Sequence, residues 1–551
     1  MNVLLTTLNA KFIHKNLALR YLYQTQPKGK YNVTLKEFTI KDSTENIVKQ
    51  IVELEPDVIG MSTYIWNVEQ IKEVLVEVKK CLPDVKIQMG GPEVSFEPEY
   101  FLEEFATDAI SCGEGEFTFW QYVEHCHEEV FDIPGIFTRT CKPTIGYSIV
   151  DLKEVEKYEN PYFLEMDMKD MGNRYLYVET SRGCPYCCSY CLSSVLGKVR
   201  LFSVDYIKRV LDQVFASDVK QVKFLDRTFN VDKNRALELA KYIDAHAKED
   251  QSFEFEIMAE ALSEELLDYL EHRQSKPKFR YEIGIQSLNQ EALKEIHRYQ
   301  NFDRLKAVVE RLGKNNNCEM HVDLIAGLPF EDLESFKHSF NEVFYLHAKE
   351  LQLGFLKLLR GTLLKDHHEM YDMEYDPHAP YEIFETKWMS KEDINEIHIC
   401  CYALDVLYNK PRLRRTIDML VHDYHLQPFD VFTTLGRDLY THKYNQIDLI
   451  MKSVIHTVKE YYHIDIVGSC NEEYYRLFKN KTKRIVPYTL DESMRDKYLE
   501  MLYNANVGSM NDLINYGIFA KGKEGELFIL YSSKQSYPKL YVINEVVEEI
   551  K

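Results

Sequence analysis

The sequence predicts an α/β fold with a Rossmann-like domain first, a partial (β/α)6 barrel next and a mostly helical C-terminal extension. Strand and helix patterns alternate from residue 2 to about 130, start again at residue 175 and fade near residue 371. Alternation of this kind indicates parallel sheets covered by helices. We therefore expect domains at residues 1–130, 173–365 and 366–551, with a connector at 131–172.

The N-terminal domain has five predicted strands, at residues 2–7, 32–40, 57–62, 85–89 and 109–112. Helical patterns such as 44–55 and 68–81 lie between them, which is typical of a doubly wound parallel sheet. Ligands of such sheets bind at the carboxyl ends of the strands. The segments that follow the strands there are 9–16, 62–67, the Gly-Gly-Pro run at 90–92 and the Gly-Glu-Gly-Glu run at 113–116.

The second domain has six predicted strands, at residues 175–180, 222–229, 253–259, 280–286, 319–326 and 351–358. In α/β barrels, chemistry collects at the C-terminal ends of the strands. Asp226, Glu260 and Gln286 stand at such ends, and Arg298 follows. Each also has a plainer explanation, because an acidic residue at a strand end commonly caps a helix and an arginine commonly forms a surface ion pair.

A loop at residues 181–192 holds Cys184, Cys188 and Cys191 in a C-x3-C-x2-C spacing, with Tyr190 before the last cysteine. Ferredoxin clusters and structural zinc sites close with four ligands, so three thiolates leave one iron of a [4Fe–4S] cluster open to another molecule. A zinc knuckle or a disulfide is the alternative, but no second Cys/His pair lies nearby. Cys187 falls outside the spacing and is interpreted as a bystander thiol.

Composition limits the classes of partner. The formal net charge of −21 counts against a nucleic-acid partner, because an acidic surface repels phosphates. No signal-peptide pattern and no apolar run near the ~20 residues of a membrane span is present. Twelve cysteines in 551 residues do not form a secreted disulfide pattern, so we expect a cytoplasmic protein.

The cysteine loop, its Arg182-Gly183 start and the strand before it resemble the radical S-adenosylmethionine (SAM) superfamily. The resemblance implies a [4Fe–4S] cluster on Cys184, Cys188 and Cys191, whose open iron is chelated by SAM and which cleaves SAM to a 5′-deoxyadenosyl radical. It also implies an external reductant, a flavodoxin or ferredoxin. The SAM contacts that it implies are Tyr190, Asp226, Glu260, Gln286 and Arg298.

The N-terminal loops resemble the cobalamin-binding domain fused to some radical SAM enzymes. The implied cobalamin contacts are Asn9, His14, Ser62, Thr63, Tyr64, Trp66, Gly90, Gly91, Pro92, Glu114, Gly115 and Glu116. The Asp-x-His-x-x-Gly motif that supplies a lower axial histidine is absent, so Tyr64, Trp66 or a water is expected to face the cobalt. The alternative is a generic Rossmann-like domain whose glycines only form turns.

Together these resemblances imply a cobalamin-dependent radical SAM enzyme of the class B methyltransferase type, acting on an unidentified small-molecule or peptide substrate. A rearrangement or other non-methylating enzyme, and a non-catalytic cobalamin-binding sensor, remain open alternatives. In the C-terminal extension, helices are expected at 391–408, 412–422 and 447–462, and strands at 527–531 and 540–543. His398, His422 and His425 are scattered there, and their spacing indicates no metal site.

Overall fold

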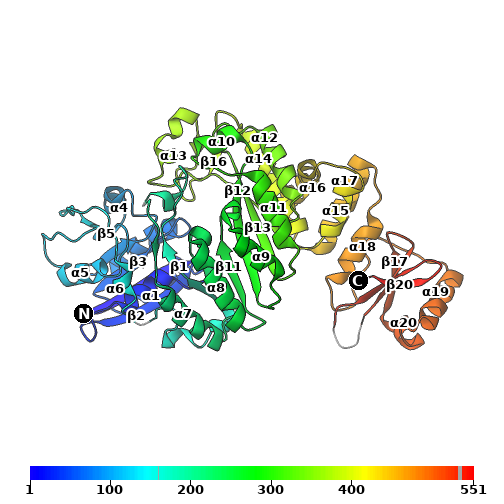
Figure 1. Ribbon diagram of the computed structural model, residues 1–551, viewed down its shortest axis with the longest axis horizontal. Helices are drawn as coiled ribbons and strands as arrows, with labels where there is room; N and C mark the ends of the chain where they lie inside the picture. Colours follow the sequence, from blue (N-terminus) through cyan, green and yellow to red (C-terminus); the bar gives the residue numbers. More distant parts are fainter. Residues whose placement is uncertain (159, 196, 532–535, 551) are drawn as a thin grey trace. The chain divides into compact units, whose positions relative to one another are not determined.

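The computed structural model describes residues 1–158, 160–195, 197–531 and 536–550, and the chain divides into two compact units. The first unit contains residues 1–336 and 354–390 and holds one mainly parallel sheet and most of a second. The second contains residues 337–353 and 391–551. Figure 1 shows the elements along the chain.

The first sheet has the strand order β2-β1-β3-β4-β5-β6, parallel except for the last strand. Its strands are β1 (Asn2–Asn9), β2 (Asn32–Thr39), β3 (Val58–Ser62), β4 (Lys86–Gly90), β5 (Ala109–Ser111) and β6 (Ile136–Thr138). The order reverses between β1 and β3, which makes this edge a switch point of the kind where doubly wound sheets bind ligands. The predicted doubly wound fold is confirmed, and β6, which lies in the predicted connector, extends its sheet.

Helices cover both faces of this sheet. On one face, α2 (Thr44–Val52), α3 (Val68–Cys81) and α4 (Pro98–Glu104) pack on strand side chains such as Leu4 and Ile59. On the other, α1 (Leu17–Gln24) and α5 (Thr118–His125) pack on Val3 and Leu5. Strands buried on both faces read as continuous apolar runs, as β3 does.

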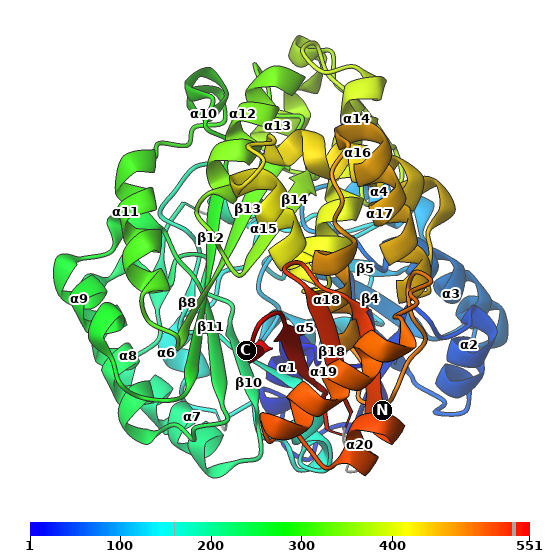
Figure 2. The same cartoon turned by 90° about the vertical axis from the view of Figure 1, so that its right-hand side faces the viewer.

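The second sheet has the strand order β14-β13-β12-β11-β10-β7. Its strands are β7 (Tyr175–Val178), β10 (Gln221–Phe224), β11 (Ser252–Glu256), β12 (Lys278–Gln286), β13 (Cys318–Ala326) and β14 (Glu350–Phe355). Burial alternates along β12 and β13, because one face packs on helices and the other points into the barrel. Figure 2 shows α7 (Val204–Ala216), α8 (Lys233–His246), α9 (Glu264–His272) and α11 (Phe302–Gly313) along the outer face.

The predicted partial barrel is confirmed, but several strands end earlier than expected: those predicted at 253–259 and 351–358 end at Glu256 and Phe355. The strand expected at 222–229 ends at Phe224, and Asp226 lies in the loop beyond it. A short antiparallel pair, β8 (Ser181–Arg182) and β9 (Arg200–Leu201), closes the base of the cysteine loop.

The second unit is helical at first and ends in a small sheet. The helices are α14 (Lys391–Leu404), which continues as a π-helical turn over Asp405–Asn409, α15 (Arg414–His422), α16 (Pro428–His442), α17 (Ile447–Tyr462) and α18 (Val467–Arg476). The four-stranded antiparallel sheet consists of β17 (Gly517–Lys521), β18 (Glu526–Leu530), β19 (Lys539–Ile543) and β20 (Val547–Ile550). Its core includes Leu499 and Leu502 of α19 (Glu492–Asn504) and Leu513 of α20 (Met510–Tyr516). Among the described residues, no helix is long and apolar enough to span a bilayer.

Candidate functional site

A cavity of about 750 Å³ lies at the carboxyl ends of β1, β3 and β4. Every residue that the sequence assigned to cobalamin lines it except Thr63. Thr63 is fully buried, and its backbone lies so close to Gly91 that a Cβ on that glycine would come within 2.3 Å of the Thr63 carbonyl oxygen. Gly91 also has φ = +113°, so the sharp turn beside the cavity requires glycine.

The cavity also contains polar groups that have no hydrogen-bond partner among the described residues. They are both side-chain amide atoms of Gln88, the Ser111 hydroxyl and Oε2 of Glu116. A buried polar atom left unpaired costs roughly 1–3 kcal/mol. A ligand with its own donors and acceptors would satisfy these groups, and the volume falls within the ~300–1,000 Å³ usual for cofactor pockets. The residues present therefore fit a large polar cofactor such as cobalamin.

The aromatic pair that follows β3 forms part of the cavity wall. The rings of Tyr64 and Trp66 are stacked, with centroids 4.3 Å apart and planes 7° apart. Asn16 donates its side-chain N–H to the Tyr64 hydroxyl at 2.8 Å, and burial raises the pKa of Tyr64. The phenol is therefore neutral at ordinary pH. Trp66 is 46% exposed, which leaves it free to contact a ligand.

His14 forms a hydrogen bond with a residue of the second sheet. Its Nδ1 lies 2.6 Å from the hydroxyl of Tyr177, on β7 of the second sheet. Burial lowers the pKa of His14, and Lys223 and Lys11 act in the same direction. The imidazole is thus neutral near pH 7 and connects the two sheets across the cavity.

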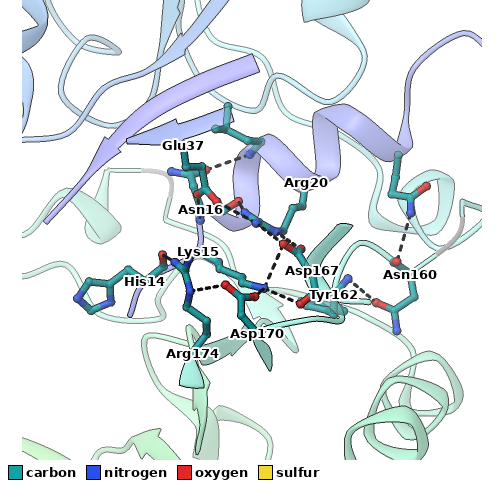
Figure 3. Close-up of polar contacts among 12 residues, drawn as sticks. His14, Lys15, Asn16, Arg20, Glu37, Asn160, Tyr162, Asp167, Asp170 and Arg174 are labelled. Carbon is teal, nitrogen blue, oxygen red and sulfur yellow. Dashed lines mark hydrogen bonds and ion pairs between the residues drawn. The ribbon is translucent and has the colours of Figure 1, made fainter. Parts of the chain in front are cut away.

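The segment around His14 is fixed by charged groups of the connector (Figure 3). Arg20 is 4% exposed and forms two hydrogen bonds with Asp167, at 2.6 and 2.8 Å, and one with Glu37 at 2.9 Å. Lys15 forms an ion pair with Asp170 at 2.9 Å. Paired, bidentate contacts of this type hold geometry well. The connector therefore positions the first cavity loop.

The cysteine loop starts at Gly183, whose φ is +89°, and a Cβ there would come within 2.2 Å of the Lys198 carbonyl oxygen. The Ser194 hydroxyl donates to the carbonyl oxygens of Cys188 and Cys191, at 2.9 and 2.6 Å. All the cysteines of the chain are free thiols, which argues against a disulfide here, and Cys187 is exposed. The loop is thus shaped by backbone constraints and leaves its thiols available.

Cys188 lies near the guanidinium of Arg298 and two further thiols. Burial raises the pKa of Cys188, whereas the positive charge of Arg298 lowers it. The neighbouring Cys191 and Cys184 raise this pKa further. Three interacting thiols beside a guanidinium suit an anionic cluster held by thiolates. Arg298 also interacts with Tyr190, so the aromatic residue of the loop faces the same region.

Two predicted SAM contacts keep unpaired atoms at this end of the barrel. Both carboxylate oxygens of Glu260 and Oε1 of Gln286 are buried and lack a hydrogen-bond partner within the described part of the chain. Gln286 has φ = +70° and stands at a register shift between β12 and β13. Arg298 donates to the carbonyl oxygen of Gly284. These three residues therefore form a polar site beside the cysteine loop.

Asp226, the other predicted SAM contact at a strand end, is placed differently. It is 1% exposed, and its carboxylate accepts hydrogen bonds from the Thr180 backbone N–H at 3.0 Å, the Thr180 hydroxyl at 2.7 Å and the Ser181 hydroxyl. Its oxygens are thus used within the protein. The geometry favours a positioning role for Asp226, at the junction of β7 and the cysteine loop.

Arg182 connects the cysteine loop to the cavity. Its guanidinium forms ion pairs with Glu116 at 2.6 Å, Glu179 at 2.6 Å and Glu114 at 3.4 Å, and all four residues line the cavity. Sequence reasoning missed Arg182 and Glu179 as cavity residues, and also Asn16 and Gln88. The available signal for Gln88 was a polar side chain within an otherwise apolar buried strand.

Comparison with known proteins gives three family matches. Residues 3–123 match the B12 binding domain, residues 178–343 the Radical SAM superfamily, and residues 369–536 the family described as "Protein of unknown function (DUF4080)". The chain is a radical SAM protein with an N-terminal B12-binding domain. Most of the residues that line the cavity lie within the B12-binding match, and the cysteine loop lies within the radical SAM match.

Two curated relatives are similar to part of this chain. The chain is 27% identical over 303 residues to the cobalamin-dependent radical SAM methyltransferase TokK of Streptomyces tokunonensis, covering 52% of this chain and 44% of that protein. It is 29% identical over 239 residues to the uncharacterized methyltransferase PH0819 of Pyrococcus horikoshii, covering 41% and 51%. The chain thus spans about half the length of these relatives.

A solved structure shares the fold. The cobalamin-dependent SAM radical enzyme OxsB, with aqua-cobalamin and SAM bound, superposes with a TM-score of 0.62 at 16% identity, covering 92% of this chain and 84% of that one. At this identity the likeness concerns the fold alone. It agrees with the parallel sheets of the first unit.

Proposed function

We propose that this protein is a cobalamin-dependent radical SAM methyltransferase that methylates an unactivated carbon of a small-molecule or peptide substrate. One observation carries the proposal. The cavity of the B12-binding domain is also lined by Tyr177, Glu179, Arg182, Leu225 and Arg227, which lie at the strand ends of the radical SAM domain beside the cysteine loop. A cobalamin there would share a wall with the SAM site.

The chain's own residues would hold three groups. Cys184, Cys188 and Cys191 would bind the cluster, Tyr190, Glu260, Gln286 and Arg298 would contact SAM, and the cavity loops would bind cobalamin. When bound, these cofactors supply a hydrogen-abstracting radical and a transferable methyl group; the protein supplies position and the exclusion of water. Arg298 is suited to the SAM carboxylate because its fork can donate two parallel hydrogen bonds.

The names of two relatives support methyl transfer over other chemistry. TokK and PH0819 are both named methyltransferases, and their similarity to this chain covers 52% and 41% of it. Among the described residues that line the cavity, His14 is the histidine, and the hydrogen bond between its Nδ1 and the Tyr177 hydroxyl leaves its Nε2 for any other contact. Tyr64 and Trp66 line the cavity and would contact the cofactor there, which agrees with the absence of the Asp-x-His-x-x-Gly motif from the sequence.

The setting of the reaction is part of the same proposal. A reduced cluster needs an electron donor, for which a flavodoxin or ferredoxin is the expected class, and a reducing cytoplasm suits a protein whose thiols are all free. We do not expect a nucleic-acid substrate, since the net charge is −21.

The test is turnover of SAM by anaerobically reconstituted protein with cobalamin and a reductant. We expect both 5′-deoxyadenosine and S-adenosylhomocysteine from the wild type and from Cys187→Ala, the matched thiol of the same loop. The triple variant Cys184→Ala, Cys188→Ala, Cys191→Ala should form neither. 5′-Deoxyadenosine without S-adenosylhomocysteine would indicate a non-methylating enzyme, and absence of both from the cobalamin-loaded wild type would indicate a sensor.

A further inference from the structure

Three potential metal ligands meet in the second unit, outside the cofactor sites. His347, Asp418 and His422 each offer a ligand atom, and these atoms all lie within 4.8 Å of one another. His347 stands in the turn between α12 (Leu333–Phe344) and β14, whereas Asp418 and His422 belong to α15. The chain brings them together from positions about 70 residues apart, which is why the histidine spacing alone indicated no site.

The local geometry would allow the three side chains to bind one metal ion. Asp418 and His422 are four residues apart on one helix, so their side chains lie on the same face. The ring centroids of His347 and His422 are 5.3 Å apart. His347 has φ = +51°, a left-handed conformation that is uncommon for a residue other than glycine, and its N–H donates to the Phe344 carbonyl oxygen at 3.1 Å. The turn thus directs this imidazole toward α15.

The neighbouring groups support the carboxylate and leave the histidines accessible. The Tyr408 hydroxyl donates to Oδ1 of Asp418 at 3.2 Å, as groups behind a metal ligand commonly do. Both histidines are exposed and Asp418 is partly buried. The nearby cation, Arg414, is engaged elsewhere, because its Nη2 donates to the Lys349 carbonyl oxygen at 2.7 Å and to that of Ala348 at 3.2 Å.

A plainer explanation is a surface ion pair between an aspartate and protonated histidines. That explanation accounts for one histidine beside Asp418. Two imidazoles and a carboxylate whose ligand atoms lie within 4.8 Å of one another are the kind of ligand set that proteins use for Zn²⁺ and related divalent ions, with open positions filled by water.

We propose that His347, Asp418 and His422 form a binding site for a divalent transition-metal ion of the Zn²⁺ type. The ion would be held by two imidazole nitrogens and one carboxylate oxygen, and it would tie the turn that precedes β14 to α15. This site is independent of the cofactors of the proposed function. Its exposed position leaves coordination sites open to water or to a ligand.

The experiment uses the full chain with its cluster assembled, so that the cluster cysteines do not compete for the added metal. Zn²⁺ would be titrated against a chromophoric chelator in the wild type and in His347→Ala, Asp418→Asn and His422→Ala. His456→Ala, an exposed histidine on α17, is the matched control. We expect one Zn²⁺ per chain in the wild type and the control, and at least about tenfold weaker binding in each ligand variant, the loss already typical of changes around a ligand.

A second measurement separates binding from folding. Zn²⁺ should raise the melting temperature of the wild type and of His456→Ala and leave that of the three ligand variants unchanged, while all five proteins melt alike in chelator. Equal affinity in wild type and ligand variants, or no binding at micromolar Zn²⁺ by a wild type of normal melting temperature, would overturn the proposal.

Discussion

The two parallel sheets of the first unit place polar residues at the same position, the carboxyl ends of their strands, but use them differently. At the first sheet, Gln88, Ser111 and Glu116 line a cavity with atoms that lack partners among the described residues. At the second sheet, Glu260 and Gln286 keep such atoms, whereas Asp226 is saturated by hydrogen bonds from Thr180 and Ser181. Position at a strand end is therefore not enough to mark a ligand contact.

What distinguishes the two kinds of residue is whether the protein already satisfies the polar group. A saturated carboxylate supports its neighbours, and its loss changes the structure of the site. An unpaired buried carboxylate is unfavourable until a ligand pairs with it, and its loss changes binding. The following variants test this distinction, from the largest expected effect to the smallest.

Asp226→Asn should have the largest effect. The amide replaces one acceptor with a donor that faces the donor groups of Thr180 and Ser181, so at least one buried bond is lost, at roughly 1–3 kcal/mol or more for a charged acceptor. We expect a lower melting temperature of the apoprotein and a reduced iron content after reconstitution. Asp205→Asn, on the exposed start of α7, is the control. If iron content and melting temperature stay normal while SAM affinity falls, Asp226 contacts SAM directly.

Glu260→Gln should show the opposite pattern. Because neither carboxylate oxygen has a hydrogen-bond partner in the described chain, removing the charge costs the fold no side-chain hydrogen bond, only the attraction to Arg298. We expect the cluster absorbance and melting temperature to be retained and the dissociation constant for SAM to rise about tenfold, which corresponds to ~1.4 kcal/mol. Exposed Glu265→Gln on α9 is the matched control. Unchanged SAM affinity would remove Glu260 from the site.

Arg182→Lys tests the connection between the two sheets. A lysine ammonium cannot reproduce the fork that pairs with Glu116 and Glu179, so the Gly-Glu-Gly-Glu loop should lose its fixed position. We expect cobalamin retention on desalting to fall several-fold, in line with a loss of about 1 kcal/mol. Arg209→Lys, exposed on α7, should retain cobalamin as the wild type does. Equal retention in both variants would show that the two sheets are positioned independently.

The sequence predicted the architecture of the first unit because strand and helix periods are local properties, and the cavity loops because their place on a doubly wound sheet follows from strand order. The cysteine loop was equally accessible, since three cysteines in one short segment need no tertiary information. The saturation of Asp226 was not predictable, because its hydrogen-bond donors, Thr180 and Ser181, lie 46 and 45 residues earlier in the chain. The same limit hid Arg182 among the cavity residues.

The second unit shows that limit more strongly. The helices predicted from apolar spacing at 391–408, 412–422 and 447–462 correspond to α14 with its π-helical turn, α15 and α17, but α16, α18, α19 and α20 were not predicted. The strands β17 and β20 were also missed, because short strands of an antiparallel sheet lack the repeated strand–helix rhythm. His347 and His422 could not be paired from spacing, since one lies in a turn and the other on a helix 75 residues further along the chain.

The smallest expected effect concerns Glu331, which forms a hydrogen bond with the residue after the proposed SAM contact Gln286. Glu331 is fully buried, and its Oε1 accepts a hydrogen bond from the Ser287 hydroxyl, next to Gln286. Burial raises the pKa of Glu331 to about 8, opposed in part by that hydrogen bond. The native state therefore holds a proton here that the unfolded state has already released above pH ~4.5.

The sign of the pH dependence follows. The pKa of Glu331 is higher in the folded state than in the unfolded state. The contribution of Glu331 to the free energy of unfolding is therefore complete below the unfolded-state pKa, and it is lost as pH rises through the folded-state pKa. Between pH 7 and 9 the wild type should lose about 1 kcal/mol relative to Glu331→Gln, since one pKa unit corresponds to ~1.36 kcal/mol. The measurement is the melting temperature of the apoproteins across this range, with exposed Glu310→Gln as the control that should follow the wild type. Parallel curves for wild type and Glu331→Gln would mean that Glu331 is ionised in the native state, and that a partner other than Ser287 compensates its charge.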